Sequence, residues 1–287
     1  MRIAYSPADS VGKYGGDIDN WMWPRHTGDF AFYRAYVDKN GKPTEYSKDN
    51  VPYEPKHFLK VSAKGIDDGD LVMVAVYPGS TNRYALLSNV EHVFSWLYPT
   101  YIDIIAEWIE TIEKSAPVGS DARVKYESSL AGLNNFLKNT KGQLEGAQRV
   151  GLVDRRAERE AQLNQWLNKD SSRLDVAKSI AKLNEMAKQK AVTDKQEFWY
   201  GFATRPALLG VAQNLYRLSI ESQKPDTQRE QGYQERDIER IEERMKRIDR
   251  RFDATVDMAL WQMYLANYLA EPKERRVLAL DKALGLD

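Results

Sequence analysis

The sequence predicts an α+β fold in which a β-rich part is followed by a larger, all-helical part. Eight of the 17 glycines and six of the 11 prolines precede residue 80, between apolar and aromatic runs that have the length of strands. Between Pro117 and Pro206 there is no proline, and apolar residues recur at spacings of three and four. We therefore expect two domains, residues 1–84 and residues 85–287.

Three runs in the first part have strand patterns. FAFYRAYV (30–37) and HFLKVSA (57–63) alternate, whereas DLVMVAVYP (70–78) is continuously apolar, as in a buried strand. Asn40-Gly41 within DKNGKP predicts a hairpin turn; a calcium loop would need a later glycine and a closing glutamate. Because four or five strands cannot easily cover their own core, we expect this part to be half of a larger barrel or sandwich.

The second part contains four stretches that predict helices. The four stretches are the segment with the stripe Leu130, Leu133, Leu137 and Leu144, residues 155–169, residues 172–191 and residues 226–270. We expect Asp170 or Ser171 to be the N-cap of the helix over residues 172–191. We expect the helix over residues 226–270 to be the longest.

The last stretch has a narrow apolar stripe at alternating spacings of three and four. It is too short for a free coiled coil, so we expect an arm packed along one face within its own domain. Glu242/Lys246 and Glu243/Arg247 form i,i+4 pairs on the other side, which predicts a solvated face more readily than a nucleic-acid site. The stripe consists of Ile238, Ile241, Met245, Ile248 and Phe252.

Charge and hydropathy exclude several partners. The chain has 42 basic and 42 acidic residues, so no net field attracts nucleic acid or an anionic membrane. No run approaches the roughly 20 apolar residues of a membrane span. We expect no nucleic-acid partner and no membrane span.

The residue types also exclude several chemistries. Without cysteine, the chain has no disulfide, thiolate metal site or cysteine nucleophile, and it fits an oxidising or a reducing compartment. The G-x-S-x-G, G-x-x-x-x-G-K-[ST] and H-E-x-x-H motifs are absent. His26 lies three residues before Asp29, a spacing that fits a metal pair or a His–Asp hydrogen bond, but His57 and His92 are scattered. We expect no metal and no cofactor.

The stretch GGDIDNWMWPRHTGDF (15–30) is dense in charged and aromatic residues, as in the irregular surface segments that carry binding and catalytic groups. Its last acid, Asp29, lies between Gly28 and the alternating run that follows. We expect its carboxylate to be held at the edge of a sheet. A carboxylate held in this way can orient an imidazole, as in a Ser–His–Asp triad, but the histidine and the serine must come from elsewhere.

This stretch closely resembles the segment GGD-x-DNWMWPRHTGDF of the bacterial serine dipeptidyl peptidases 7 and 11. The resemblance continues through DNVPYEPKHFLKVSAKGIDDGDLVMVAVYPGSTNRY, where Ser80 stands at a position at which arginine is common in the family. It extends through SLAGLNNFLKNTKGQLEG and so covers essentially the whole chain.

The resemblance implies a partial chymotrypsin-like β-barrel followed by a helical cap domain, and an enzyme that releases dipeptides from the free amino terminus of peptides. Asp29 would be the triad aspartate. Asn20 and Trp21 would bind the terminal amine of the substrate, and Asn135 would reach the same amine from the cap. From helical spacing alone, Asn135 is expected to be a solvent-facing residue beside the leucine stripe.

The family's catalytic histidine lies upstream of this segment, and its serine lies downstream. The chain is therefore expected to be a middle portion of a periplasmic or secreted enzyme, inactive alone, whose intact form is a homodimer acting on peptides. Two alternatives stay open. One is a noncatalytic helical interaction module, favoured by a large exposed apolar stripe. The other is a metal hydrolase in which His26, His57 and His92 converge.

Overall fold

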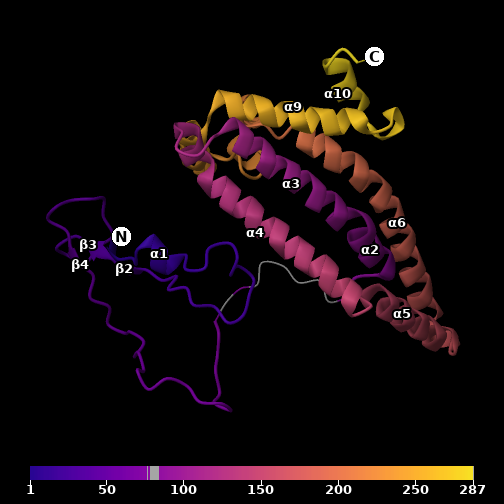
Figure 1. The fold of residues 1–287 in the computed structure, drawn as a ribbon, viewed down its shortest axis with the longest axis horizontal. Helices are drawn as coiled ribbons and strands as arrows, with labels where there is room; N and C mark the ends of the chain where they lie inside the picture. Colours follow the sequence, from indigo (N-terminus) through magenta and orange to yellow (C-terminus); the bar gives the residue numbers. More distant parts are fainter. Residues whose placement is uncertain (76, 78–83, 287) are drawn as a thin grey trace. The chain divides into compact units, whose positions relative to one another are not determined.

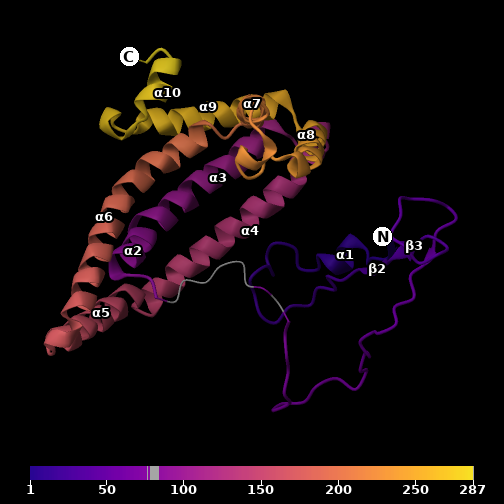
Figure 2. The same cartoon turned by 180° about the vertical axis from the view of Figure 1, so that it is seen from behind.

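The computed structural model describes residues 1–75, 77 and 84–286, which fall into two compact units, Met1–Arg83 and Tyr84–Asp287. Each unit is described by itself (Figures 1 and 2). Ser80 lies outside the described residues.

Among the residues that the structure describes, the first unit contains short strands and one short helix, and the second contains helices but no strand. The elements of the first unit are β1 (Arg2–Tyr5), α1 (Asp9–Gly12), β2 (Phe32–Arg34), β3 (Tyr36–Val37) and β4 (Val51–Pro52). The longer helices of the second are α2 (Leu87–His92), which continues through a π-helical turn (Val93–Leu97) into α3 (Tyr98–Ser115), then α4 (Asp121–Arg149), α5 (Leu152–Asn168), α6 (Leu174–Ala203), α7 (Ala207–Glu221), α8 (Ile238–Arg251), α9 (Ala254–Ala270) and α10 (Leu278–Ala283). Single 3₁₀ turns are Ser171–Arg173, Asp226–Gln228, Glu235–Asp237 and Lys273–Arg275.

The strands form two separate antiparallel pairs. Strand β1 pairs with β2, with Ile3 opposite Tyr33, and β3 pairs with β4, with Val37 opposite Val51. The run predicted as one strand over residues 30–37 is thus divided between two sheets. The α+β class is confirmed at the level of a mostly helical protein with few strands, but no closed barrel is formed by the described residues.

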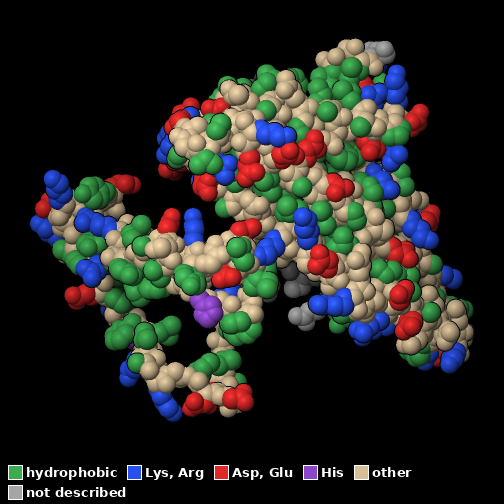
Figure 3. Space-filling view, viewed as in Figure 1, with side chains coloured by type: hydrophobic (Ala, Val, Ile, Leu, Met, Phe, Trp, Pro, Cys, Tyr) green, Lys and Arg blue, Asp and Glu red, His purple; other side chains and the backbone are tan. Residues whose placement is uncertain are grey.

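The prediction of strands over residues 57–63 and 70–78 is wrong for the residues that the structure describes. No strand is formed in residues 53–75, and residues 76 and 78 lie outside the description. Leu59, Val61 and Leu71 are each at least 94% exposed, and apolar side chains lie open along the first unit in Figure 3. A strand needs a neighbouring strand for its backbone N–H and C=O groups, and no described strand lies beside these runs.

The predicted turn in DKNGKP is confirmed. The backbone N–H of Asp38 donates to the carbonyl of Lys42 at 3.0 Å, and that of Gly41 donates to the carbonyl of Asp38 at 3.0 Å. The Asp38 carboxylate accepts from the backbone N–H groups of Asn40 and Lys42, both at 2.8 Å. With φ at +77°, Gly41 occupies the left-handed region that glycine favours.

The core of the second unit lies where α3 packs against α4 and α9, and where α6 packs against α9. Leu130 of the predicted stripe is 3% exposed, and Leu133 and Leu137 pack against the same cluster. None of the described helices is both long and apolar enough for a bilayer span. The buried residues of the cluster are Ile104, Ile105, Ile112, Ala116, Tyr126, Leu130, Phe202, Val256, Leu260, Met263 and Tyr264.

Local capping residues set several helix boundaries. The Ser120 side chain accepts from the backbone N–H of Arg123 at the start of α4. Of the two N-caps proposed before α6, Asp170 caps the 3₁₀ turn Ser171–Arg173 that leads into α6, because its carboxylate accepts from the backbone N–H of Ser172 at 2.9 Å. The N-cap of α6 itself is Arg173, which makes no side-chain cap.

The prediction of a single long helix over residues 226–270 is wrong. Two 3₁₀ turns precede α8, and the chain leaves the helix at Phe252, where φ is −80° and ψ is 138°. Asp253 then caps α9 by accepting from the backbone N–H groups of Thr255 and Val256. The expected stripe on α8 is half-buried and α8 packs against α4, so the prediction of an arm packed within its own domain is confirmed for this shorter helix.

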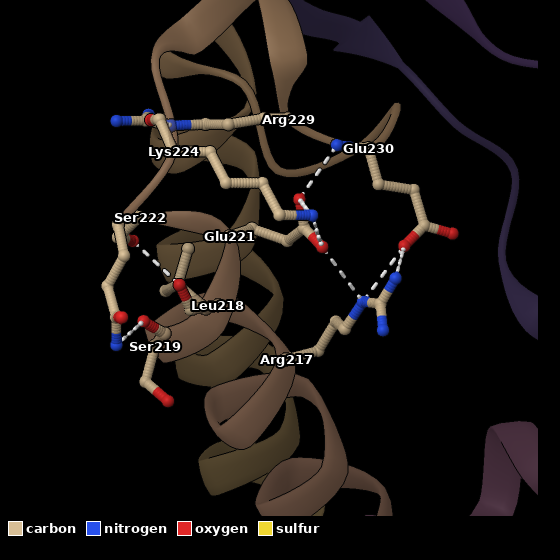
Figure 4. Close-up of polar contacts among 9 residues, drawn as sticks. Arg217, Leu218, Ser219, Glu221, Ser222, Lys224, Arg229 and Glu230 are labelled. Atoms are coloured by element: carbon tan, nitrogen blue, oxygen red, sulfur yellow. Dashed lines mark hydrogen bonds and ion pairs between the residues drawn. The ribbon is translucent and has the colours of Figure 1, made fainter.

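Two buried carboxylates fix α7. At its start, Asp257 of α9 accepts from the backbone N–H of Ala207 at 2.7 Å. At its end, Glu221 is 0% exposed. Its two oxygens each lie 2.8 Å from Nζ of Lys224, one accepts from the backbone N–H of Glu230 at 2.9 Å, and the other lies 3.2 Å from Nε of Arg217 (Figure 4). The carboxylate therefore joins the end of α7 to the segment that follows it.

We expect Glu221→Gln to lower Tm by several degrees at pH 7, because the change leaves the Lys224 ammonium beside a neutral amide. The hydrogen bond from Lys224 lowers the pKa of Glu221 below its ordinary value of 4.5. Its contribution to stability is therefore present above pH 4.5 and lost as the pH falls through the lowered pKa. Thermal melts from pH 7 to pH 3 should show the difference between the two proteins shrinking.

Glu230→Gln is the matched control for this prediction. Glu230 is 53% exposed and pairs with Arg217 at the surface, so its removal should change Tm little. An equal loss in both variants would contradict the role of Glu221.

Candidate functional site

The segment after α1 is a loop built from consecutive tight turns. The backbone N–H of Asp19 donates to the carbonyl of Gly15 at 3.2 Å, that of Asn20 to Asp17 at 3.3 Å, and that of Met22 to Asp19 at 3.1 Å. We call residues 13–28 the acidic-aromatic loop. Its base is closed where the N–H of Gly28 donates to the carbonyl of Val11 in α1 at 2.9 Å, so the backbone at both ends of the loop is fixed.

Glycine is required at position 15. Its φ is +77°, and a Cβ built there would lie 1.8 Å from Oδ2 and 2.7 Å from Cβ of Asp19. The carboxylate of Asp19 therefore occupies the space that a side chain at position 15 would need. A sequence reading could find the positive φ in the Gly-Gly pair, but not this contact.

We expect Gly15→Ala to destabilise the loop by about 1–3 kcal/mol, because it adds a clash with Asp19 to the strain of a positive φ. Hydrogen exchange of the backbone amides of residues 15–22 should become faster. Gly41→Ala is the matched control, since Gly41 has the same φ of +77° and nothing within 4 Å of a built Cβ. Equal effects on local protection at the two positions would contradict the clash with Asp19.

Asp29 follows the closed base of the loop. The N–H of Phe30 donates to the carbonyl of Gly28 at 3.0 Å, and the ring of Phe30 lies 5.9 Å from Tyr5 and 5.7 Å from Phe32, centroid to centroid. The backbone on both sides of Asp29 is thus attached to the β1–β2 sheet and to α1. Asp29 precedes the first residue of β2 by three positions, and it is exposed.

Asn20 and Trp21 lie in the middle of the acidic-aromatic loop. Asn20 is half-buried and Trp21 is 56% exposed. Trp21 has a φ of +59°, a backbone conformation that is uncommon for a bulky residue. Such outliers are held by their surroundings and cluster at functional sites, which supports a site at this loop.

Asn135 lies on α4 in the second unit. It is exposed, beside the stripe of Leu130, Leu133 and Leu137 that packs into the core. This is the surface position that helical spacing predicts. Asn20, Trp21 and Asp29 belong to the first unit, so the convergence of all four residues on one substrate stays a prediction.

The three histidines have different surroundings. His26 and His57 are exposed, whereas His92 is half-buried and stacks on Trp96 with ring centroids 5.1 Å apart. Nε2 of His92 lies 3.7 Å from Asp194, and burial lowers the pKa of His92. Among the residues that the structure describes, no three or more His, Asp or Glu side chains form a group that could hold a metal ion.

Arg156 and Glu160 on α5 belong to no motif that predicts a role for them. Both contact the segment at the start of α2, where Arg156 donates to the carbonyl of Ala85 and Glu160 accepts from the backbone N–H of Leu87. Their i,i+4 spacing places both side chains on one face of the helix. This spacing is visible in the sequence, but it does not show which backbone groups the two side chains contact.

A family model and individual relatives both match this chain, and the relatives are named as dipeptidyl-peptidases. The family described as Peptidase S46 matches residues 1–287. An Asp/Glu-specific dipeptidyl-peptidase of Shewanella putrefaciens is 43% identical over 287 residues, which are 100% of this chain and 39% of that protein. A dipeptidyl-peptidase 7 of Capnocytophaga gingivalis is 33% identical over 183 residues, 64% of this chain and 26% of that protein.

Among solved structures, Porphyromonas endodontalis DPP11 in complex with the dipeptide Arg-Glu matches with a TM-score of 0.64 and 25% identity, covering 96% of this chain and 40% of that one. DPP11 of the same organism in complex with Arg-Asp matches with a TM-score of 0.61. The chain thus spans about two fifths of the length of the relatives that it matches over its whole length.

Proposed function

The chain belongs to the peptidase S46 family, and from that premise we propose that it is part of a serine dipeptidyl aminopeptidase that releases dipeptides from the free amino terminus of peptides. The observation that carries the proposal is the family match over all 287 residues. The names of the relatives support it, since they are dipeptidyl-peptidases.

Asp29 is proposed as the triad aspartate. In a Ser–His–Asp triad the carboxylate fixes the tautomer of the histidine and stabilises the imidazolium that forms during acyl transfer. The backbone around Asp29 is held by hydrogen bonds and ring contacts, and its exposure leaves room for an imidazole. The histidine and the serine are proposed to come from parts of the protein outside residues 1–287.

Asn20, Trp21 and Asn135 are proposed to bind the terminal ammonium of the substrate. Asparagine oxygens accept hydrogen bonds from an ammonium, and the face of a tryptophan attracts a cation while it excludes water. An amine held at a fixed distance from the nucleophile restricts cleavage to the second peptide bond. The half-buried position of Asn20 and the positive φ of Trp21 support a loop conformation that is held by its surroundings.

Three further properties belong to the same proposal. The relative that is 43% identical is named Asp/Glu-specific, so an acidic second residue is the proposed preference. The intact enzyme is proposed to be a homodimer in the periplasm or outside the cell. Residues 1–287 alone are proposed to be inactive, because a triad without its nucleophile and base loses most of its catalysis.

The proposal is tested with the full-length protein and a peptide that carries glutamate at its second position. Mass spectrometry should show stepwise loss of dipeptides from the free peptide and no cleavage of the N-acetylated one. Replacing the glutamate by leucine tests the acidic preference. A full-length protein that binds other proteins but releases no dipeptide from any peptide would favour the noncatalytic interaction module.

A further inference from the structure

His92 lies at the end of α2, where this helix passes into the π-helical turn Val93–Leu97. Helix α2 packs against α6 and lies beside it in both views (Figures 1 and 2). The ring of His92 stacks on that of Trp96, with centroids 5.1 Å and planes 18° apart, and the ring of Trp96 meets that of Phe198 on α6 edge-on at 5.4 Å. The imidazole is thus part of the packing between the π-helical turn and α6.

The surroundings of Nε2 of His92 do not provide a hydrogen bond. The side chain is 13% exposed, and this buried nitrogen has no hydrogen-bond partner among the residues that the structure describes. Oδ2 of Asp194 on α6 is 3.7 Å away, which is beyond hydrogen-bond distance. The other oxygen of that carboxylate accepts from Nζ of Lys190. The acid that faces His92 is therefore already paired with a cation.

The charged groups that face His92 belong to α6. They are Asp194, Lys190 and Lys195, and Nζ of Lys195 lies 5.3 Å from the centroid of the Trp96 ring. Two lysines and one aspartate leave a net positive charge beside the imidazole. A proton on His92 would add a second positive charge at a position that is largely shielded from water.

The charged groups of the other elements lie away from the imidazole. Arg156 and Glu160 of α5 bind the backbone where α2 begins, at the opposite end of this helix from His92. Glu91, the acid next to His92 on α2, is exposed to solvent. The balance of charge at the imidazole is therefore set by α6.

This environment opposes protonation of His92. Burial lowers the pKa of His92; Asp194 acts against this effect, and Lys195 and Lys190 add to it. A histidine with a lowered pKa in the folded state leaves stability intact above its ordinary value of 6.5. Stability is then lost as the pH falls from 6.5 through the lowered pKa. The cost is relieved when the charged ring moves into water.

We propose that His92 is an acid-sensitive latch: the neutral ring keeps residues 92–97 packed on α6, and the protonated ring leaves this packing for solvent. The start of α2 stays attached through Arg156 and Glu160, so the opening is local. Single π-helical turns within α-helices occur frequently at functional sites, which supports a role for this segment. The latch lies within the helical unit and does not depend on the proposed function.

The test is hydrogen exchange of the full-length protein, read by mass spectrometry at about pH 7.5 and about pH 5.5, between which histidine titrates. Labelling times are scaled to the intrinsic exchange rate at each pH. Peptides that contain residues 92–97 should lose protection several-fold at the lower pH, whereas peptides from α9 should not. His92→Gln, which cannot titrate, should abolish this pH dependence.

His57→Gln is the matched control, because His57 is exposed and lies in the first unit. It should keep the full pH dependence of residues 92–97. No loss of protection at the lower pH in the unmodified protein, or an equal loss in His92→Gln, would overturn the inference.

Asp194→Asn provides a second test, for the case in which His92→Gln folds poorly. Asp194 is the group on α6 that favours the charged imidazole, so its removal should make the loss of protection at the lower pH larger. If protonated His92 instead formed an ion pair with Asp194, protection would rise at the lower pH and Asp194→Asn would abolish that rise. This result, or an equal or smaller loss in Asp194→Asn, would overturn the inference.

Discussion

Asp29→Asn is expected to lower kcat of the full-length protein for a dipeptidyl substrate by about 10⁴-fold. The amide keeps the size of the side chain, but it cannot stabilise an imidazolium and it favours the wrong tautomer of the histidine. Because the backbone at Gly28 and Phe30 is held independently of the carboxylate, the variant should fold normally. Steady-state kinetics with unchanged Tm is the measurement.

Asp68→Asn is the matched control for this result. Asp68 is exposed and belongs to the same unit, so the same change of charge there should leave kcat unchanged. Full activity of Asp29→Asn would contradict the triad role. An equal loss in both variants would instead show that the acids of this unit act through net charge.

The second large effect is expected for Asn20→Ala, which should raise KM for a free-amine substrate by about 10- to 100-fold. Hydrogen bonds to charged groups contribute about 1.5–3 kcal/mol, and the substrate ammonium would lose one such acceptor. The loss should be specific to the amine, so the preference for a free over an N-acetylated substrate should fall by a similar factor. Kinetics with the two substrates checks this.

Asn89→Ala is the control, because Asn89 is an exposed asparagine on α2. Asn20→Ala could also distort the turn that contains it. Hydrogen exchange of residues 15–22 distinguishes the two cases, since a distorted loop would exchange faster. A variant with a normal loop and an unchanged KM would contradict the role of Asn20 in amine binding.

Much of the helical unit could be predicted from the sequence. The predictions for residues 155–169 and for the leucine stripe are confirmed by α5 and α4, and that for 172–191 by α6, which extends to Ala203. The break at Phe252 differs from the prediction because the apolar stripe continues through this residue, whereas Asp253 caps a new helix directly after it. An aspartate after an apolar stripe is a local signal for a helix start.

The candidate site could be predicted only in part. The composition of residues 15–30 indicated a functional loop, and the family resemblance, now shown by the comparisons, suggested roles for Asp29, Asn20 and Trp21. The approach of the Asp19 side chain to Gly15 and the positive φ of Trp21 could not be predicted, because they belong to an irregular loop whose backbone no periodic pattern indicates.

Local sequence is enough to specify the caps Ser120, Asp170 and Asp253, the Asn40-Gly41 turn and most of the helices, since these depend on hydrogen bonds between residues at most four positions apart. The packing of the whole chain selects the apolar runs that become strands and the distant side chains that cap helices. Asp257 contacts the start of α7 from 50 residues away, and Glu160 contacts Leu87 from 73 residues away. The reason is physical: a strand or a distant cap needs a partner that only the packed chain brings into place.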